Sequence, residues 1–284
     1  MEKEDDFMEV DMLPVSVVCY DNIEEVINFG MGLARQNMAE KLMYLVTCNK
    51  CKQKKKLREG LDAIQINYRI YEPLNNLGYI HGCLFGLEEF SKSFNYTWAL
   101  ISNTDISFKD KDFFREVFIG QMGEKDWCIA PHIINAVDGV LQNPFMIHRI
   151  SKYKIILYNI FFSNKYFYAF YVRLSLLKKM KKRKKIARVK NTEQKIYAAH
   201  GSCFFLKRDC VDALLENNDN VFMYGEEILI AEIIRENRKN VIYNTSIAVT
   251  HYENQITGKI NYGTKQMWFK QSMSYLYKRF FRIL

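Results

Sequence analysis

Residues 15–20, Val-Ser-Val-Val-Cys-Tyr, form a short apolar run rich in β-branched side chains, which predicts a buried strand. Asp21 or Asn22 then offers a cap for a helix whose apolar residues recur at helical spacing over 23–33. The same order continues, with strands predicted at 42–47, 64–71 and 98–101, a helix at 50–60 and another that ends near residue 90. This alternation is typical of parallel β-α-β units. We therefore expect an open, mostly parallel α/β sheet covered by helices on both faces.

The second half of the chain departs from this alternation after about residue 120. Strands are predicted at 127–131, 198–206 and 241–251, and a helix at 222–236. Residues 147–192 form an aromatic and basic segment with helical periodicity, which predicts a helical insertion. Residues 263–284 are predicted to form a basic, amphipathic C-terminal helix whose apolar stripe is Phe269, Met273, Leu276, Phe280 and Leu284.

The composition excludes several classes of protein. With 49% hydrophobic and 26% charged residues, the 284-residue chain is able to form a packed core and is not disordered in bulk. Seven of the eight residues at 178–185 are Lys or Arg, so the net charge of +9 falls to +2 (9 − 7) without them. We therefore expect no nucleic-acid partner. A nucleic-acid-binding protein that uses this basic run stays as an alternative.

The cysteines and the apolar segments indicate a cytoplasmic protein. Seven dispersed cysteines are typical of a reducing compartment. Cys48 and Cys51 form a CxxC pair, but no second pair follows at the spacing of a zinc site, so ordinary thiols are expected. The start of the chain is acidic, unlike a signal peptide, and the apolar stretch 155–172 is interrupted by two Asn and one Lys. No membrane-spanning helix is predicted.

Polar side chains follow the predicted strands at the carboxyl ends, where ligands bind in open α/β sheets. They are Tyr20 and Asp21 after the first strand, Asn76 and Gly78 after the third, and Asn103 and Asp105 after the fourth. A carboxylate such as Asp105 in this place suits a hard divalent cation, which in turn neutralises a diphosphate. Glu226 and Glu227 begin a predicted helix, and His251 ends the last strand. Each of these also has a plain structural explanation, since acids at a helix start complement its dipole.

In this order the motifs resemble those of the inverting nucleotide-sugar glycosyltransferases of family two, which have the GT-A fold. The bacterial rhamnosyltransferase and galactofuranosyltransferase branch is the most similar. The resemblance runs from about residue 15 to residue 251. It rests on the strand at 15–20, the turn and helix at 76–86, Ile-Ser-Asn-Thr-Asp at 101–105, Gly-Ser-Cys-Phe-Phe-Leu at 201–206, Tyr-Gly-Glu-Glu at 224–227 and Val-Thr-His at 249–251. The chain departs from the family at Thr47, Leu84 and Asn103, where the family carries Asp, Asn and Asp.

The resemblance implies an enzyme that moves a sugar, with inversion, from a nucleotide-sugar donor to a glycan or lipid-linked acceptor in bacterial cell-surface polysaccharide synthesis. A UDP-sugar is the first choice of donor and dTDP-rhamnose the second. The resemblance also implies Mn²⁺ or Mg²⁺ held by Asp105 and His251, and Glu227, with Glu226 beside it, as the base. The implied donor contacts are Tyr20, Asp21, Asn76, Gly78, Gly82, Asn103 and Asp105. A catalytically weak, scaffold-like relative is the alternative that Thr47 and Leu84 leave open.

The resemblance further divides the chain into a GT-A domain at 1–262 and the C-terminal helix at 263–284. Within the domain, residues of about 12–110 form the nucleotide-sugar half, and those of about 111–262 the acceptor half. Two segments predict attachment to the inner face of the cell membrane without spanning it: the aromatic stretch that runs into 178–185, and the C-terminal stripe with its basic flanks. Packing of the stripe on the domain, or on a second subunit in a homodimer, is the alternative.

Overall fold

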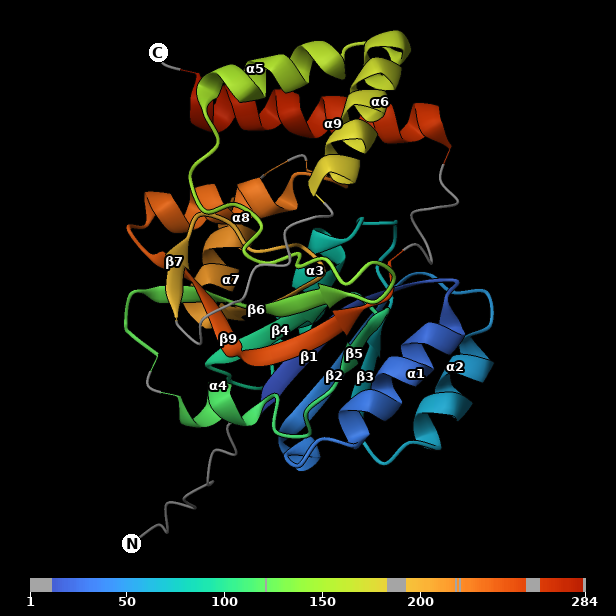
Figure 1. The fold of residues 1–284 in the computed structure, drawn as a ribbon. Helices are drawn as coiled ribbons and strands as arrows, with labels where there is room; N and C mark the ends of the chain where they lie inside the picture. The colour runs from blue at the N-terminus through green and yellow to red at the C-terminus, as the bar shows by residue number, and fades with distance from the viewer. Residues whose placement is uncertain are drawn as a thin grey trace, which may run out of the picture.

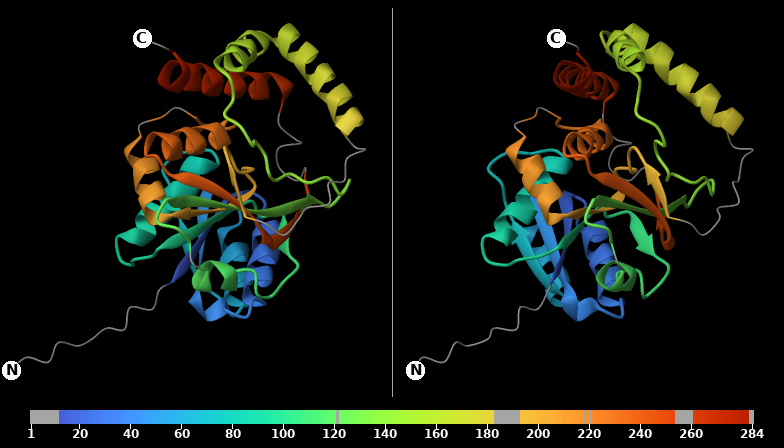
Figure 2. Two further views of the ribbon diagram at one scale, coloured as in Figure 1. Left: turned by 60° about the vertical axis from the view of Figure 1, so that its left-hand side comes forward. Right: turned by 90° about the vertical axis from the view of Figure 1, so that its left-hand side faces the viewer.

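A computed structural model describes residues 12–120, 122–182, 193–217, 219, 221–253 and 261–282, and leaves aside the side chains of residue 119 and residues 176–182. Its centre is one nine-stranded sheet in the order β3-β2-β1-β4-β8-β6-β9-β5, with β7 paired to β9 (Figure 1). Helices cover both faces of this sheet, and a further helical layer lies beyond one face (Figure 2). The α/β fold predicted from the sequence is confirmed.

The first half of the chain builds four neighbouring parallel strands. They are β1 (Leu13–Tyr20), β2 (Leu42–Lys50), β3 (Asn67–Tyr71) and β4 (Trp98–Ser102), joined through α1 (Ile23–Ala34), η1 (Ala39–Lys41), α2 (Lys54–Asp62) and α3 (Ile80–Ser91). α1 and α2 cover one face and α3 the other (Figure 1). The helix predicted from residue 50 begins only at Lys54, because Lys50 still belongs to β2. Asn22 is the N-cap residue of α1, but its side chain accepts from the Tyr20 N–H and caps no helical N–H.

The second half mixes strand directions. Its elements are β5 (Ile106–Phe108), α4 (Arg115–Ile119), β6 (Asp126–Asn135), β7 (Gln194–Ile196), β8 (Cys203–Lys207), α7 (Arg208–Glu216), α8 (Glu226–Glu236) and β9 (Asn240–His251). β8 runs antiparallel to both β4 and β6, whereas β6 and β9 are parallel. The strand predicted at 198–206 begins at Cys203, because the residues before it form a loop. That loop carries part of the candidate site.

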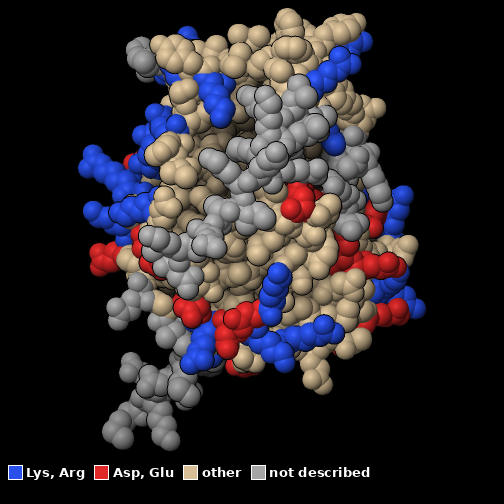
Figure 3. All heavy atoms as spheres, in the orientation of Figure 1, with Lys and Arg blue, Asp and Glu red and all other residues tan. Residues whose placement is uncertain are grey.

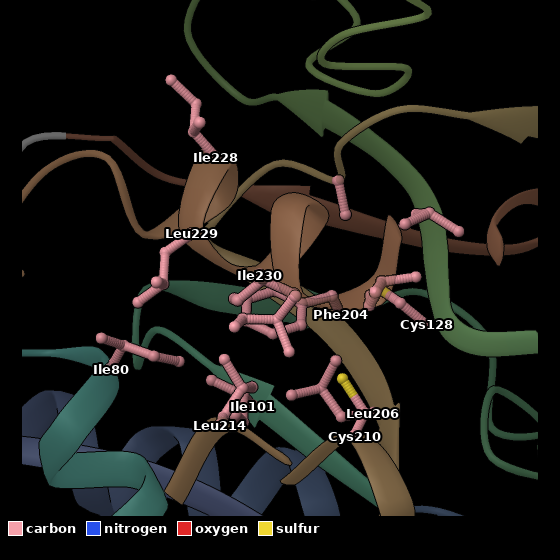
Figure 4. Close-up of a cluster of buried hydrophobic side chains, with 14 of the residues drawn as sticks. Ile80, Ile101, Cys128, Phe204, Leu206, Cys210, Leu214, Ile228, Leu229 and Ile230 are labelled. Carbon is pink, nitrogen blue, oxygen red and sulfur yellow. The ribbon is translucent and has the colours of Figure 1, made fainter. Parts of the chain in front are cut away.

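Two apolar clusters hold the layers together, one on each face of the sheet. On the face that carries α3, α7 and α8, side chains from all three helices converge on β4, β6 and β8 (Figure 4). Phe204 is almost fully buried at 1% exposure, and Leu229 at 0% fills the start of α8. Each fully buried side chain of this size contributes roughly 2 kcal/mol. The packing fixes where α8 begins, and with it the two glutamates of its first turn.

Beyond α8 lies a layer of α5 (Lys152–Phe161), α6 (Lys165–Lys182) and α9 (Tyr262–Leu276), which continues into the short turn η3 (Tyr277–Phe281) (Figures 1 and 2). The single helical insertion predicted from the sequence is two helices. The Asn164 side chain accepts the N–H groups of Tyr166 and Phe167, which starts α6 as a new helix. Residues 183–192 lie outside the described residues. Among the helices described, none has both the length and the apolar character needed to cross a bilayer.

The C-terminal stripe faces inward, as the packing alternative expects. Met273 and Leu276 are buried at 3% and 0% exposure, and Phe269 contacts both Phe162 and Tyr224. Leu284 lies outside the described residues. The stripe is therefore part of the core and does not present a lipid-facing surface.

Glu232 of α8 ties this helical layer to the sheet domain. Its carboxylate has no solvent exposure and accepts from Arg149 at 2.7 and 2.9 Å, Tyr197 at 2.6 Å and Arg235 at 2.9 Å. Arg149 also donates to the carbonyl oxygen of Phe280, next to the C-terminal turn. Burial alone would raise the pKa of Glu232, but these three donors hold it below its ordinary value. The buried charge is thus fully partnered.

Candidate functional site

The carboxyl ends of β1 and β2 form the first wall of the site. Tyr20 is exposed there, and Asp21 has a left-handed backbone with φ 58°. The Asp21 carboxylate accepts the Lys52 N–H at 3.0 Å and pairs with the Lys50 ammonium at 3.0 Å. Burial opposes ionisation of Asp21, but these two partners hold its pKa below the ordinary value. A charged, fixed Asp21 therefore stands beside an aromatic ring at the edge predicted to hold the donor.

The glycine turn before α3 forms the second wall. Gly78 has φ 76°, and a Cβ there would lie 2.0 Å from the carbonyl oxygen of Phe222, so only glycine fits. The Asn49 amide brackets the turn, donating to the Gly78 carbonyl oxygen at 2.6 Å and accepting the Leu77 N–H at 3.1 Å. Asn76, exposed, accepts the Gly78 N–H at 3.0 Å. Asn49 was not predicted as a site residue, although its place near the carboxyl end of β2 is the available signal.

Gly82 has a packing role in this structure. It is buried in the first turn of α3, where a Cβ would lie 2.7 Å from Val18 of β1. Gly86, one turn later, would meet the Thr47 hydroxyl at 2.8 Å. These glycines let α3 approach the sheet closely, and this approach sets the position of the Gly78 turn relative to the sheet. The structure thus gives Gly82 a packing role against the sheet, and its predicted contact with the donor stays a prediction.

Asp105 and His251 come together although 146 residues separate them. Ile106 of β5 lies opposite His251 of β9, and this pairing brings the Asp105 Oδ1 within 3.1 Å of the His251 Nε2. Asn103 lies two residues before Asp105, its N–H donating to the Ser202 carbonyl oxygen at 2.7 Å. The predicted pair of metal ligands is therefore adjacent in space.

A chain of hydrogen bonds sets the tautomer of His251. The Gln142 amide donates through Nε2 to Glu253 at 2.7 Å, so its Oε1 is the atom that lies 2.8 Å from the His251 Nδ1. Because Oε1 only accepts, Nδ1 must carry the proton. Nε2 is then the ring nitrogen that faces Asp105, with a lone pair in the neutral ring and an N–H in the charged ring. Metal-binding histidines are oriented by this kind of hydrogen bond at the other ring nitrogen.

These residues fit a hard divalent cation. The buried Asp105 Oδ1 has no hydrogen-bond partner within the described residues, and it lies 3.1 Å from the His251 Nε2. A cation bound by both atoms, or a proton between them, makes this contact favourable. Adjacent ligands of an octahedral Mg²⁺-sized ion are roughly 3 Å apart, close to the separation observed. One carboxylate and one imidazole leave further positions for substrate oxygens. Mg²⁺ or Mn²⁺ suits this donor set.

Glu226 and Glu227 form the opposite side of the site. They begin α8 after Tyr224 and Gly225, both with positive φ, at 65° and 94°. Both carboxylates face Gly201, where a Cβ would lie 3.0 Å from Glu227 and 3.3 Å from Glu226. Burial, together with the charge of Glu227, raises the pKa of Glu226 to about 8. Burial also raises the pKa of Glu227, although backbone N–H groups including that of Gly201 oppose the shift.

The loop before β8 joins the two sides. The ring of His200 lies 5.8 Å from the ring of His251. Gly201, which follows His200, faces both glutamates. The Ser202 carbonyl oxygen accepts the Asn103 N–H. The predicted metal pair and the predicted base are therefore parts of one site. His200 was not predicted, because nothing in the sequence distinguishes it from a surface histidine.

Several buried polar atoms of this site have no hydrogen-bond partner among the described residues. Within the described residues they include the Tyr79 hydroxyl, the Asp105 Oδ1 and the Glu226 Oε2. The pKa of Tyr79 is raised chiefly by burial and also by the charges of Glu226 and Asp105, so Tyr79 lies close to both sides. A pocket of about 510 Å³ opens beside Asp105 and is lined also by Glu25, Thr104 and Tyr252. A bound ligand, ion or water at this site would satisfy these groups.

Comparison with known proteins shows the fold. Neither a protein-family model nor a curated protein matches the sequence, whereas many solved structures match the fold. The mannosyltransferase PcManGT of Pyrobaculum calidifontis, in complex with GDP-Man and Mn²⁺, has a TM-score of 0.54 and 11% identity over 86% of this chain and 58% of its own. GalNAc-T7, with UDP, GalNAc and Mn²⁺, has a TM-score of 0.56 and 11% identity over 88% of this chain and 45% of its own.

TarS 1–349 of S. aureus, in complex with UDP-GlcNAc, has a TM-score of 0.52 and 13% identity over 88% of this chain and 61% of its own. The chain thus spans about half to three fifths of the length of these three structures. The architecture that arranges the site described above is a GT-A-like fold, similar to that of known glycosyltransferases.

Proposed function

We propose that the protein is a metal-dependent, inverting glycosyltransferase that moves a sugar from a nucleotide-sugar donor to an acceptor hydroxyl. One observation carries the proposal: the loop 200–202 brings the Asp105–His251 pair against two glutamates of raised pKa. This arrangement lies at the carboxyl edge of a GT-A-like sheet. The donor half is residues of about 12–110 and the acceptor half residues of about 111–262.

Asp105 and His251 would hold the divalent cation, which when bound neutralises the charge that develops on the departing nucleoside diphosphate. Gln142 holds His251 in the tautomer that this role requires. Tyr20, Asp21, Asn76, Gly78 and Asn103 line the donor side, Tyr20 offering a ring and Asp21 a carboxylate to the nucleoside. The donor is thus held between the ends of β1, β2 and β4.

Glu227 is the base in this proposal. At neutral pH a Glu226 pKa of about 8 keeps Glu226 mainly protonated, so Glu227 carries the charge of the pair. Glu227 takes the proton of the acceptor hydroxyl. At the same time the acceptor oxygen bonds to C1 of the sugar, and the bond from C1 to the diphosphate breaks. A single displacement of this kind inverts the configuration at C1. The nucleoside diphosphate leaves with the electron pair of the broken bond.

The proposed donor is a UDP-sugar, with dTDP-rhamnose as the second choice, and the proposed acceptor is a glycan or a lipid-linked saccharide of bacterial cell-surface polysaccharide synthesis. UDP or a UDP-sugar in the complexes of GalNAc-T7 and TarS supports the first choice, whereas PcManGT binds GDP-Man. The Asn49 amide holds the Gly78 turn through hydrogen bonds to the Gly78 carbonyl oxygen and the Leu77 N–H. These bonds support donor binding although Thr47 stands where the family carries Asp.

The test is nucleotide release from a panel of UDP-, dTDP-, GDP- and CMP-sugars with Mn²⁺. One donor is expected to be turned over, with the product inverted at C1. Glu227→Gln should abolish transfer and keep donor binding, while the matched variant Glu216→Gln, exposed at the end of α7, should be active. Donor binding without turnover by the wild type would favour the alternative of a catalytically weak, scaffold-like relative. Full activity of Glu227→Gln would remove Glu227 from the role of base.

We also propose that the protein works at the cytoplasmic face of an anionic membrane, with α5 and α6 at the lipid surface. Residues 139–192 and 254–284, which include α5, α6 and α9, contain no Asp or Glu. Tyr153, Tyr166 and Phe170 are exposed at 83%, 75% and 54%. Lys and Arg and uncharged side chains dominate this layer at the top of Figure 3. Exposed aromatic rings among cations suit the headgroup region of anionic lipid, where each cation contributes on the order of 1 kcal/mol.

Co-sedimentation with vesicles tests this attachment. Binding to anionic vesicles and not to neutral ones is expected, with loss at high salt and after replacement of the Lys and Arg residues of 178–185 by Ser and Gln. Tyr166→Ser with Phe170→Ser should weaken binding, while Leu74→Ser, fully exposed after β3, should not. A homodimer that covers α5 and α6 in solution, or equal binding to both kinds of vesicle, would contradict the proposal.

A further inference from the structure

Three cysteines meet at the carboxyl ends of β1 and β2, on the face that α1 and α2 cover. The Sγ atoms of Cys19, Cys48 and Cys51 all lie within 4.8 Å of one another. Cys19 and Cys48 are buried, at 0% and 6% exposure, and Cys51 is half-buried. The sequence shows only a CxxC pair, because the third thiol comes from the neighbouring strand. All three are free thiols in the structure.

A β-bulge brings the three thiols together. Cys19 lies opposite Cys48, but Tyr20 lies opposite Lys50, so Asn49 is an extra residue in β2. In a regular strand, residues three apart point to opposite faces. The extra residue returns Cys51 to the face of Cys48, while the Asn49 amide reaches the Gly78 turn. One local irregularity thus serves both the donor edge and the thiol cluster.

We propose that Cys19, Cys48 and Cys51 form a second cation site, for a thiophilic divalent ion such as Zn²⁺, which fastens the end of β1 to the end of β2. Sulfur ligands of a tetrahedral zinc ion, bound at about 2.3 Å, lie about 3.8 Å from one another. The observed separations reach this value with shifts of about 1 Å or less. Three thiolates leave one position for water. Thiols are soft ligands, so this site and the Asp105–His251 pair select different metals.

The surroundings suit an ion held by thiolates. Lys50, Lys52 and Lys54 flank the cluster in sequence; the Lys54 ammonium pairs with Glu72 and lies near enough for a charge on Cys48 or Cys51 to act on it. Contact with Cys19 and burial raise the pKa of Cys48, and burial raises that of Cys51. The ion must therefore displace protons, and its affinity should fall as the pH falls.

The position of the cluster links it to the donor edge. Cys19 is followed at once by Tyr20 and Asp21, and Cys51 precedes Lys52, whose N–H holds the Asp21 carboxylate at 3.0 Å. An ion on these thiols fixes both ends of that contact. The structure thus assigns to the ion a stabilising role next to the site, without contact with the reacting atoms.

Co²⁺ serves as the probe for this site in the reduced, metal-free, full-length chain. One Co²⁺ per chain is expected to bind with thiolate-to-cobalt charge-transfer absorption, which Zn²⁺ then abolishes by displacement. Cys51→Ser should lower the affinity by roughly 10-fold or more. The matched control is Cys210→Ala, a buried thiol on α7, which should keep the absorption. Zn²⁺ should raise the Tm of the wild type and not that of Cys51→Ser.

Because Cys51 is half-buried, Cys51→Ser is expected to fold, and far-ultraviolet circular dichroism checks this. Absence of the charge-transfer absorption in the wild type would overturn the proposal, as would the same affinity in Cys51→Ser. If mild oxidation lowers the mass of the protein by that of two hydrogen atoms and no metal binds, the cluster forms a disulfide and the proposal is overturned. None of these measurements uses sugar transfer, so they are independent of the proposed activity.

Discussion

Replacement of Glu226 by Gln should make the protein more stable at neutral and alkaline pH. The folded protein holds the pKa of Glu226 at about 8, against an ordinary 4.5, because of burial and the neighbouring Glu227. The folded state therefore binds this proton more tightly than the unfolded state does. Stability from this group is fully present below pH 4.5 and is lost as the pH rises through 8. Between pH 5 and pH 8 the contribution of Glu226 to the free energy of unfolding therefore falls by roughly 3 kcal/mol.

Urea unfolding at pH 5, 6, 7 and 8 measures this dependence in wild type and in Glu226→Gln. The difference in the free energy of unfolding should grow with pH toward about 3 kcal/mol in favour of the variant. Glu216→Gln is the matched control, because Glu216 is exposed at the end of α7, and it should follow the wild type. Parallel curves for wild type and Glu226→Gln would refute the reasoning that the fold keeps this proton.

Three further perturbations follow from the contacts. Gln142→Met removes the acceptor of the His251 Nδ1–H, so calorimetry should show a roughly 10-fold loss in Mn²⁺-dependent nucleotide affinity. Gly78→Ala should cost about 2 kcal/mol or more in urea unfolding, because its Cβ meets the Phe222 carbonyl, whereas Gly139→Ala, also at positive φ but in open space, should cost about 1 kcal/mol. Glu232→Ala removes the buried carboxylate that Arg149, Tyr197 and Arg235 share and should cost about 3 kcal/mol at pH 7. Since the pKa of Glu232 is lowered, that loss should shrink as the pH falls below 4.5.

Most of the parallel half of the sheet was predictable because β1, β2 and β4 are largely apolar runs buried on both faces, β1 being the clearest. Short elements were not predictable. β5 and β7 have three residues each, too few for a period to appear, and they are strands because β9 pairs with them. The break between α5 and α6 has a local cause in Asn164, which caps α6. An unbroken aromatic periodicity hides that signal in the sequence.

The site was predictable where a polar residue directly follows a strand or starts a helix, as Asp105 and Glu227 do. It was not predictable where a contact depends on pairing over a long sequence distance. Gln142 reaches both His251 and Glu253 from a loop more than 100 residues away. The thiol cluster depends on the bulge at Asn49, and no periodic pattern encodes a bulge.

Two residues with strained backbone lie at the edge of the molecule that carries the candidate site. Asp21 and Tyr224 are not glycines and have positive φ, at 58° and 65°, and the Gly78 turn contacts the segment that leads into Glu226. Such conformations of non-glycine residues each cost on the order of 1 kcal/mol or more and persist only where the surrounding packing imposes them. Here the apolar clusters on both faces of the sheet supply that packing, and the strained residues hold carboxylates, amides and a carbonyl in fixed positions. Rigid, incompletely satisfied polar groups of this kind are what a charged donor requires, since they need not reorganise as the leaving group gains charge.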